Sequence, residues 1–217
     1  MAKLRFIMIF SIIMCLTSCV VFADSPTDYF EDDYFEDDSY YETTFSPFID
    51  VLEGDFCYDA VNWAVAEGVT SGTSDTTFSP FETCTRGQVV TFLWRALGSP
   101  KSEMNDNIFA DVSDDAYYYE AVLWAYENYI TSGTTATTFS PDETCTSGQV
   151  ITFLWRALGE PDADISILPV SEQSQYYAQA VAWAMESNLL NYSTTKFAAE
   201  NLSPRADIVT YLYYALN

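Results

Sequence analysis

Apolar residues recur at helical spacing in three separate stretches of the chain. In the first stretch they stand at i, i+4, i+7 and i+8, which places them on one face of a helix over 56–64. The same spacing starts again at Tyr117 and at Tyr176. Downstream of the first helix a second one is predicted, with an apolar stripe made of Val89, Phe92, Leu93, Ala96 and Leu97. Each stretch therefore predicts a unit of helix, loop and helix.

Residues that start and stop helices mark the second helix of each unit. Thr85 and Gln88 form a capping box, in which the two residues satisfy each other's backbone N–H groups at the helix start. Gly98 ends this helix. In the last unit, Ser203 is expected to cap the helix and Pro204 to occupy its first position.

The units are copies of one another. Residues 78–98 recur sixty-one residues later, at 139–159. The two segments differ only at Phe81/Asp142, Arg86/Ser147 and Val90/Ile151. A looser third copy ends in a helix over 205–216.

The repeats span 45–100, 101–160 and 161–217. A unit of roughly 57 residues buries too little apolar surface to be stable alone. The three units are therefore predicted to share one core. The expected fold is all-α, with three helix-loop-helix repeats in a pseudo-threefold arrangement.

The N-terminal segment has the pattern of a secretory signal peptide. Lys3 and Arg5 precede an apolar stretch that is too short to span a bilayer. Cleavage is predicted after Ala23, so the signal peptide comprises 1–23. Two alternatives stay open: an N-terminal membrane anchor, and lipidation at Cys19, which would bring the chain to a membrane.

An acidic segment, 24–44, separates the signal peptide from the repeats. It holds nine acidic residues and no basic residue, and like charges at this density keep a segment extended. It is interpreted as a tether. The alternative is that it binds a protein partner or calcium, which would make the chain a surface assembly or interaction protein.

Composition narrows the possible functions. The 217 residues include 32 acidic and 8 basic residues, a net charge of −24, and no histidine. A chain this acidic repels a phosphate backbone, so nucleic-acid binding is not expected. The lack of histidine removes the usual acid-base group and the imidazole metal ligand. Because no acidic residue stands in a motif with a defined partner, a hydrolase with paired carboxylates is disfavoured. No catalytic residue, metal or cofactor is predicted.

Three cysteines remain after cleavage at Ala23, so at most one internal disulfide can form. Cys57 and Cys84 are the candidate pair because they fall in one repeat, and Cys145 is then left over. The alternative is three buried thiols. A zinc site is not expected, since no Cys-x-x-Cys spacing occurs.

An ordered set of short motifs carries a family resemblance. The motifs are Phe-x-Asp-Val at 48–51 and 109–112, Ala-Val-x-Trp-Ala at 60–64 and 121–125, Phe-Ser-Pro at 78–80 and 139–141, and Thr-Arg-Gly-Gln at 85–88. A glycine loop lies between the second and third motifs. In this order they resemble the S-layer homology (SLH) domain in three tandem copies. The resemblance covers 45–217.

The resemblance implies a fold and a function. The family folds as a pseudo-threefold unit around a central three-helix bundle. It binds secondary cell-wall polysaccharide, often carrying pyruvate ketals, in grooves between the repeats. The expected function is therefore that of an exported, noncatalytic module that anchors a protein to the bacterial cell surface or cell wall.

Two arginines are the main candidates for ligand binding. Arg86 and Arg205 lie in the first turn of a predicted helix, where the dipole disfavours a cation by roughly 0.3–1 kcal/mol but free N–H groups attract anions. An arginine there can hold a carboxylate, such as that of a pyruvate ketal, through two hydrogen bonds. The alternative is a salt bridge to one of the many acids. Arg86 is expected to matter most and Arg205 second, whereas Arg95 and Arg156 are expected to form structural ion pairs.

The resemblance also indicates a second set of binding candidates, Asp50, Asp111, Gly72, Gly133, Trp63 and Trp124. The tryptophans lie on the predicted apolar face, so core packing is the alternative to stacking on a sugar. The glycines permit a positive φ, and in the family they allow close approach of the glycan. The aspartates match the opening motif, but aspartate also begins turns.

Three departures from the family pattern affect the later units. Ser147 replaces the arginine of the second unit and cannot supply its charge. The third unit has residues 168–170 where aspartate is expected and Tyr192 where glycine is expected. One or two of the three grooves are therefore expected to be disabled.

Overall fold

The computed structural model describes residues 46–104, 106–192 and 196–217. The predicted signal peptide, with its alternatives at Ala23 and Cys19, and the acidic segment 24–44 lie outside these residues. All described residues fall in one compact unit.

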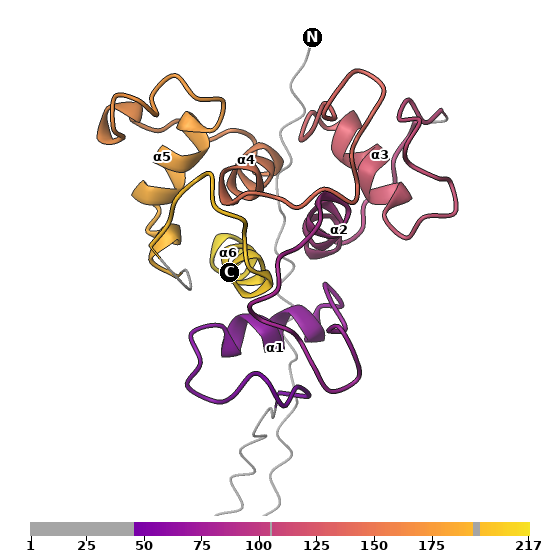
Figure 1. Ribbon diagram of the computed structural model, residues 1–217, viewed down its shortest axis with the longest axis vertical. Coiled ribbons are helices and arrows are strands. Elements are labelled where there is room, and N and C mark those ends of the chain that lie inside the picture. The colour runs from indigo at the N-terminus through magenta and orange to yellow at the C-terminus, as the bar shows by residue number, and fades with distance from the viewer. Residues whose placement is uncertain (1–45, 105, 193–195) are drawn as a thin grey trace, which may run out of the picture. The chain divides into compact units, whose positions relative to one another are not determined.

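Helices make up the regular structure of the described residues (Figure 1). They are α1 (Tyr58–Ala66), α2 (Arg86–Ala96), α3 (Tyr119–Glu127), α4 (Ser147–Ala157), η1 (Ile165–Ile167), α5 (Ala178–Glu186), η2 (Leu189–Asn191) and α6 (Arg205–Leu216), where η marks a 3₁₀ turn. The described ranges contain isolated β-bridges but no strand. The prediction of a mainly helical fold is confirmed. Within the same ranges, no helix has the length and apolar character needed to cross a membrane.

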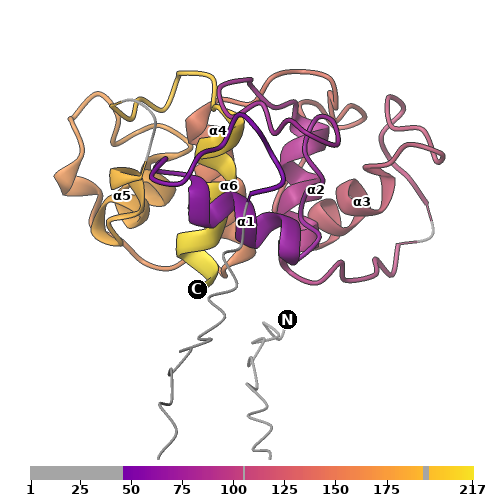
Figure 2. The ribbon, with the colours of Figure 1, turned by 90° about the horizontal axis from the view of Figure 1, so that it is seen from below.

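The second helices of the three units, α2, α4 and α6, pack against one another. Apolar side chains from all three meet between them, namely Val89, Leu93, Val150, Leu154, Ile208 and Leu212. The remaining helices lie outside this group: α3 packs on α2, α5 on α4 and α1 on α6 (Figures 1 and 2). Each outer helix therefore packs on the central helix of a different unit. The second unit thus packs on the first, the third on the second and the first on the third. The pseudo-threefold rotation itself stays a prediction.

Each central helix begins in backbone hydrogen bonds to another unit. The first N–H groups of a helix have no partner inside it. In α2 the N–H of Arg86 donates to the carbonyl of Glu143 at 2.8 Å. The equivalent bonds run from Ser147 to Asn201 at 2.8 Å and from Arg205 to Glu82 at 2.7 Å. The second N–H of each helix also donates to a carbonyl of another unit. These bonds run from Gly87 to Pro141, from Gly148 to Ala199 and from Ala206 to Pro80. The three units thus complete one another's helices.

Side-chain caps complete two of these helix starts. Thr85 forms the capping box that the sequence predicts, and Thr146 forms the equivalent box in the second unit. The start of α6 differs, because Pro204 is the N-cap and no side chain caps the helix. The Oγ of Ser203 is buried and finds no hydrogen-bond partner among the described residues. The expected cap by Ser203 is therefore wrong.

Asp50 ties the beginning of the first unit to the loop before α2. Its carboxylate accepts hydrogen bonds from the N–H groups of Phe78 at 2.9 Å and Ser79 at 2.8 Å. Ser79 has a φ of 59°, a region that side-chain-bearing residues rarely occupy. Asp111 accepts the corresponding two bonds in the second unit. The carboxylates of both aspartates are thus engaged in holding a strained turn.

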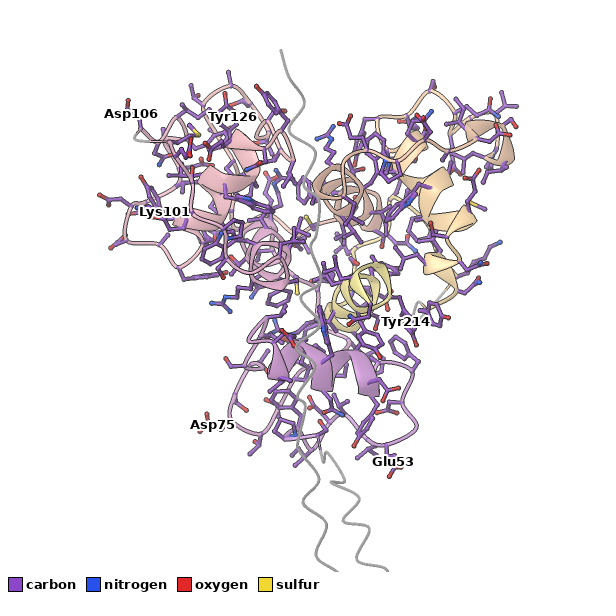
Figure 3. The ribbon with its side chains drawn as sticks, turned by 180° about the vertical axis from the view of Figure 1, so that it is seen from behind. Glu53, Asp75, Lys101, Asp106, Tyr126 and Tyr214 are labelled. Carbon is purple, nitrogen blue, oxygen red and sulfur yellow. The ribbon has the colours of Figure 1, made fainter. Side chains whose placement is uncertain are left out.

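We expect Asp50→Ala to lower the free energy of unfolding by about 1–3 kcal/mol, because it leaves two N–H groups without their acceptor. Asp75→Ala is the matched control: it removes the same charge from an exposed residue at the edge of the same unit (Figure 3). Urea unfolding followed by circular dichroism measures both. Equal midpoints for the two variants would contradict the turn-holding role.

Candidate functional site

Arg205 lies where the third unit meets the first. Its guanidinium sits between two rings, 5.1 Å from the centroid of Phe78 and 4.8 Å from that of Phe92. Its Nη2 donates to Thr70 Oγ1 at 2.6 Å and to the carbonyl of Gly72 at 3.3 Å. The side chain is only 5% exposed. One cation from α6 therefore contacts the glycine loop, the Phe-Ser-Pro segment and α2 of the first unit.

Arg86 has the same placement where the first unit meets the second. Its guanidinium lies 4.9 Å from the ring centroid of Phe139 and 5.3 Å from that of Phe153. Its Nε donates to the carbonyl of Phe139 at 2.9 Å, and the side chain is 4% exposed. These two arginine sites are called the charged junctions below.

The described residues supply no counter-ion to the charged junctions. Within the described ranges, neither arginine forms an ion pair with a carboxylate, although acids are four times as numerous as bases in the chain. The salt-bridge alternative is therefore not what the structure contains. A guanidinium over an aromatic face gains about 0.5–2 kcal/mol, more when desolvated, which helps to hold the charge in place. At Arg205 the Nε is buried and has no hydrogen-bond partner among the described residues.

The helix starts themselves are not open anion sites. The sequence predicts free backbone N–H groups at the helix starts beside Arg86 and Arg205. In the structure, the backbone N–H groups of both residues are already bonded to carbonyls of Glu143 and Glu82. The attraction for an anion at these junctions therefore comes from the guanidinium alone, and that part of the expectation is wrong.

The junction between the second and third units is neutral. Ser147 stands at the arginine position and is buried. The facing helix, α6, also differs. Tyr211 stands six residues after its first residue, at the position that Phe92 holds in α2 and Phe153 holds in α4. Tyr211 is fully buried. Loss of the cation thus coincides with gain of a ring that carries its own polar group.

Gly72 and Gly133 are required by packing inside their own units. Both have positive φ, 87° and 83°. A Cβ on Gly72 would lie 2.5 Å from Cε1 of Phe48 and 2.6 Å from the carbonyl oxygen of Thr77. A Cβ on Gly133 would meet Phe109 and Thr138 in the same way. The structure explains both glycines without a glycan.

The remaining candidates are mostly structural. Trp124 is buried at 7% exposure, and half-buried Trp63 lies 5.7 Å from the ring of Tyr213 on α6. Their positions favour core packing. Arg95 and Arg156 donate to the carbonyls of Val69 and Ile130, at 3.2 and 3.0 Å. The ion pairs expected for these two arginines are not found within the described residues.

The three described cysteines, Cys57, Cys84 and Cys145, are buried free thiols. The candidate disulfide between Cys57 and Cys84 is therefore not formed. Burial is the main cause that raises the thiol pKa to about 11 for Cys57 and Cys84 and to about 12 for Cys145. In the described part of the chain, no group of three or more acidic or cysteine side chains is placed to hold a metal ion.

Sequence reasoning missed the aromatic partners of the arginines. Phe78 and Phe139 were visible in the repeated Phe-Ser-Pro motif, and Phe92 was assigned to the apolar stripe of its helix. Neither pattern reveals that a cation from another unit lies against these rings. A cation that recurs at one helix position, with phenylalanines that recur at two others, was the available signal.

We expect Gly72→Ala to destabilise the protein by roughly 1–3 kcal/mol more than Gly98→Ala, because only the first variant adds a steric clash. Gly98 has a similar φ of 84°, but a Cβ there would meet nothing within 4 Å, so the control carries the backbone strain alone. Urea unfolding of both variants measures the difference. If the two variants were equally stable, the packing argument would fail.

Comparison with known proteins identifies the units. The family model of the S-layer homology domain matches residues 47–90 and 108–151. The chain is 29% identical over 154 residues to a surface-layer 125 kDa protein of Lysinibacillus sphaericus, covering 70% of this chain and 13% of that protein. It is 35% identical over 130 residues to an endoglucanase of Bacillus sp. (strain KSM-635), covering 60% and 13%. A cell surface protein of Thermoanaerobacter kivui is 28% identical over 123 residues, covering 55% and 16%.

The chain thus spans only about an eighth to a sixth of these relatives' length. The predicted third repeat, 161–217, is not matched by the family model and stays a prediction. The family model thus finds the S-layer homology domain twice in the chain.

Proposed function

We propose that the chain is an exported, noncatalytic module that anchors to the bacterial cell surface by binding cell-wall polysaccharide at the charged junctions. The two S-layer homology domains support this proposal. So do the relatives named as a surface-layer protein and a cell surface protein. The similarity to an endoglucanase covers 13% of that enzyme and gives no ground for assigning its activity to this chain.

The observation that carries the proposal is the buried cation without a counter-ion. The guanidinium of Arg205 has two aromatic neighbours, two neutral hydrogen-bond acceptors and the Cys84 thiol beside it, and no carboxylate of the described residues pairs with it. A carboxylate on the glycan, such as that of a pyruvate ketal, would supply the missing negative charge. Because the side chain is 5% exposed, such a ligand meets only the edge of the guanidinium.

Hydroxyl groups beside the cation suit a sugar. Thr73 Oγ1 lies 2.7 Å from Ser79 Oγ and 3.1 Å from Thr77 Oγ1, and Ser74 Oγ lies 2.6 Å from Thr77 Oγ1. All four hydrogen-bonded hydroxyls belong to the loop that follows Gly72, and the second unit repeats the arrangement. Exposed hydroxyls can exchange these bonds for bonds to sugar hydroxyls at little cost. A charged group and a hydroxyl cluster together favour an acidic polysaccharide.

The neutral junction is expected to contribute least. It has Ser147 in place of the arginine, and a polyanion approaching a chain of net charge −24 needs a local cation to hold it. The sequence ranks Arg86 above Arg205. In the structure the two side chains are about equally buried, at 4% and 5% exposure, so each offers only the edge of its guanidinium to a ligand.

Sedimentation with purified wall sacculi tests the proposal. The full chain is expected to pellet with native sacculi and to stay in solution with sacculi stripped of secondary polymers by acid. Arg205→Gln and Arg86→Gln are each expected to weaken binding roughly tenfold or more, since a hydrogen bond to a charged group contributes about 1.5–3 kcal/mol. Lys101→Gln is the control, because it removes the same charge from an exposed site (Figure 3).

Circular dichroism identifies the variants that remain folded. Folded arginine variants that bind native sacculi as well as Lys101→Gln does would exclude the charged junctions as the binding sites. Equal binding to native and stripped sacculi would exclude a secondary polysaccharide as the ligand.

A further inference from the structure

Cys84 and Cys145 occupy equivalent positions in the first two units. Each directly precedes the threonine that caps a central helix, Thr85 or Thr146. Ser203 holds the corresponding place in the third unit, one residue before the N-cap. All three side chains are buried. The segments that carry these residues are the ones that join the units through isolated antiparallel bridges.

The registers of the three bridges bring Cys84, Cys145 and Ser203 together. Two of the bridges set Ser203 opposite one cysteine each, and the remaining bridge sets the two cysteines opposite each other. Thr85 pairs with Thr144 in an antiparallel bridge, so the residue before Thr85 faces the residue after Thr144. That pair is Cys84 and Cys145, and the N–H of Cys145 donates to the carbonyl of Cys84 at 3.0 Å. Residues directly opposite each other in an antiparallel pair have Cα atoms about 4.5–5.5 Å apart and side chains on the same side of the pair. A disulfide requires Cα atoms about 4.4–6.8 Å apart.

The surroundings of the thiols agree with this placement. Cys84 is among the causes that raise the pKa of Cys145, and each thiol also lies near an arginine that lowers its pKa, Arg205 for Cys84 and Arg86 for Cys145. The groups that act on the Cys57 thiol are Asp55, Asp207 and Asp50. Cys57 precedes α1, which packs on α6. Cys84 and Cys145, which face each other across a bridge, thus belong to two different units. The pair expected from the sequence, Cys57 and Cys84, lies within one unit.

We propose that Cys84 and Cys145 form a disulfide between the first and second units when the chain folds in the presence of a thiol–disulfide oxidant. In the first step, the thiolate of one cysteine attacks the oxidant's disulfide, which gives a mixed disulfide and releases one thiol. In the second step, the thiolate of the other cysteine attacks the protein sulfur of that mixed disulfide and releases the second thiol. The two protein thiols lose two electrons and two protons, and the oxidant's disulfide is reduced to two thiols. The structure represents the dithiol form, and the inference does not depend on polysaccharide binding.

Burial determines when the bridge can form. Cys84 and Cys145 are 1% and 0% exposed, and with pKa values of about 11 and about 12 their thiolate forms are scarce at neutral pH. Since the thiolate is the nucleophile, the folded dithiol reacts slowly with an oxidant. The bridge therefore forms while the two segments come together, before the core closes over them. Once formed, it joins the first unit to the second two residues before Arg86, at a charged junction.

Refolding in a glutathione redox buffer tests the inference. The full chain carries Cys15→Ser and Cys19→Ser, so that three cysteines remain. It is unfolded and reduced, refolded with oxidised and reduced glutathione, denatured, alkylated, and analysed by intact mass and peptide mapping. The expected product has one alkylated cysteine, Cys57, and a peptide that links Cys84 to Cys145. It is also expected to unfold at a higher urea concentration than the reduced protein.

Two controls keep the result interpretable. Cys57→Ser is expected to retain the bridge in full, and protein folded first as the dithiol is expected to oxidise at least tenfold more slowly in the same buffer. Three alkylated cysteines in refolded protein with native circular dichroism would overturn the proposal. A bridge that contains Cys57 would overturn it as well.

Discussion

The constraint on which this fold depends is that no unit can complete its own central helix. The first N–H groups of α2, α4 and α6 are bonded to carbonyls of another unit, and the outer helices pack across the same boundaries. An isolated unit would expose these polar groups to water and leave its apolar faces uncovered. The three units are therefore one cooperative structure, although their sequence reads as separate copies.

The charged junctions follow from that constraint. Arg86 and Arg205 are the first residues of helices whose N–H groups are anchored on another unit, so their side chains necessarily meet that unit's aromatic residues. The aromatic rings and loop carbonyls stabilise the positive charge of each guanidinium but carry no negative charge that would neutralise it. This combination holds the units together and leaves a cation at the boundary. Where Ser147 takes the arginine position, Tyr211 changes with it and no such cation remains.

Local features of this fold could be predicted from sequence, and features that cross between units could not. The helices and the capping boxes at Thr85 and Thr146 depend on residues within one turn of each other, which the repeats display directly. Contacts between units have no such signature. The pairing of Cys57 with Cys84 was inferred from their membership of one unit, whereas the bridge register sets Cys84 against Cys145. Gly72 was linked to the glycan through the family resemblance, and its contact with Phe48, which lies in the same unit but 24 residues away, has no local sequence pattern.

If one arginine both stabilises the contact between two units and binds a ligand, ligand binding and the association of the units are coupled. A ligand that binds the closed junction but not the separated units stabilises the closed form by mass action. At Arg205 such a ligand would bring a negative charge to the exposed edge of a guanidinium that has no counter-ion among the described residues. Binding at the proposed site would therefore tighten the contact between the third and first units. The neutral junction at Ser147 lacks the charge for this coupling, so the proposed link between ligand binding and assembly is confined to the two boundaries with Arg86 and Arg205.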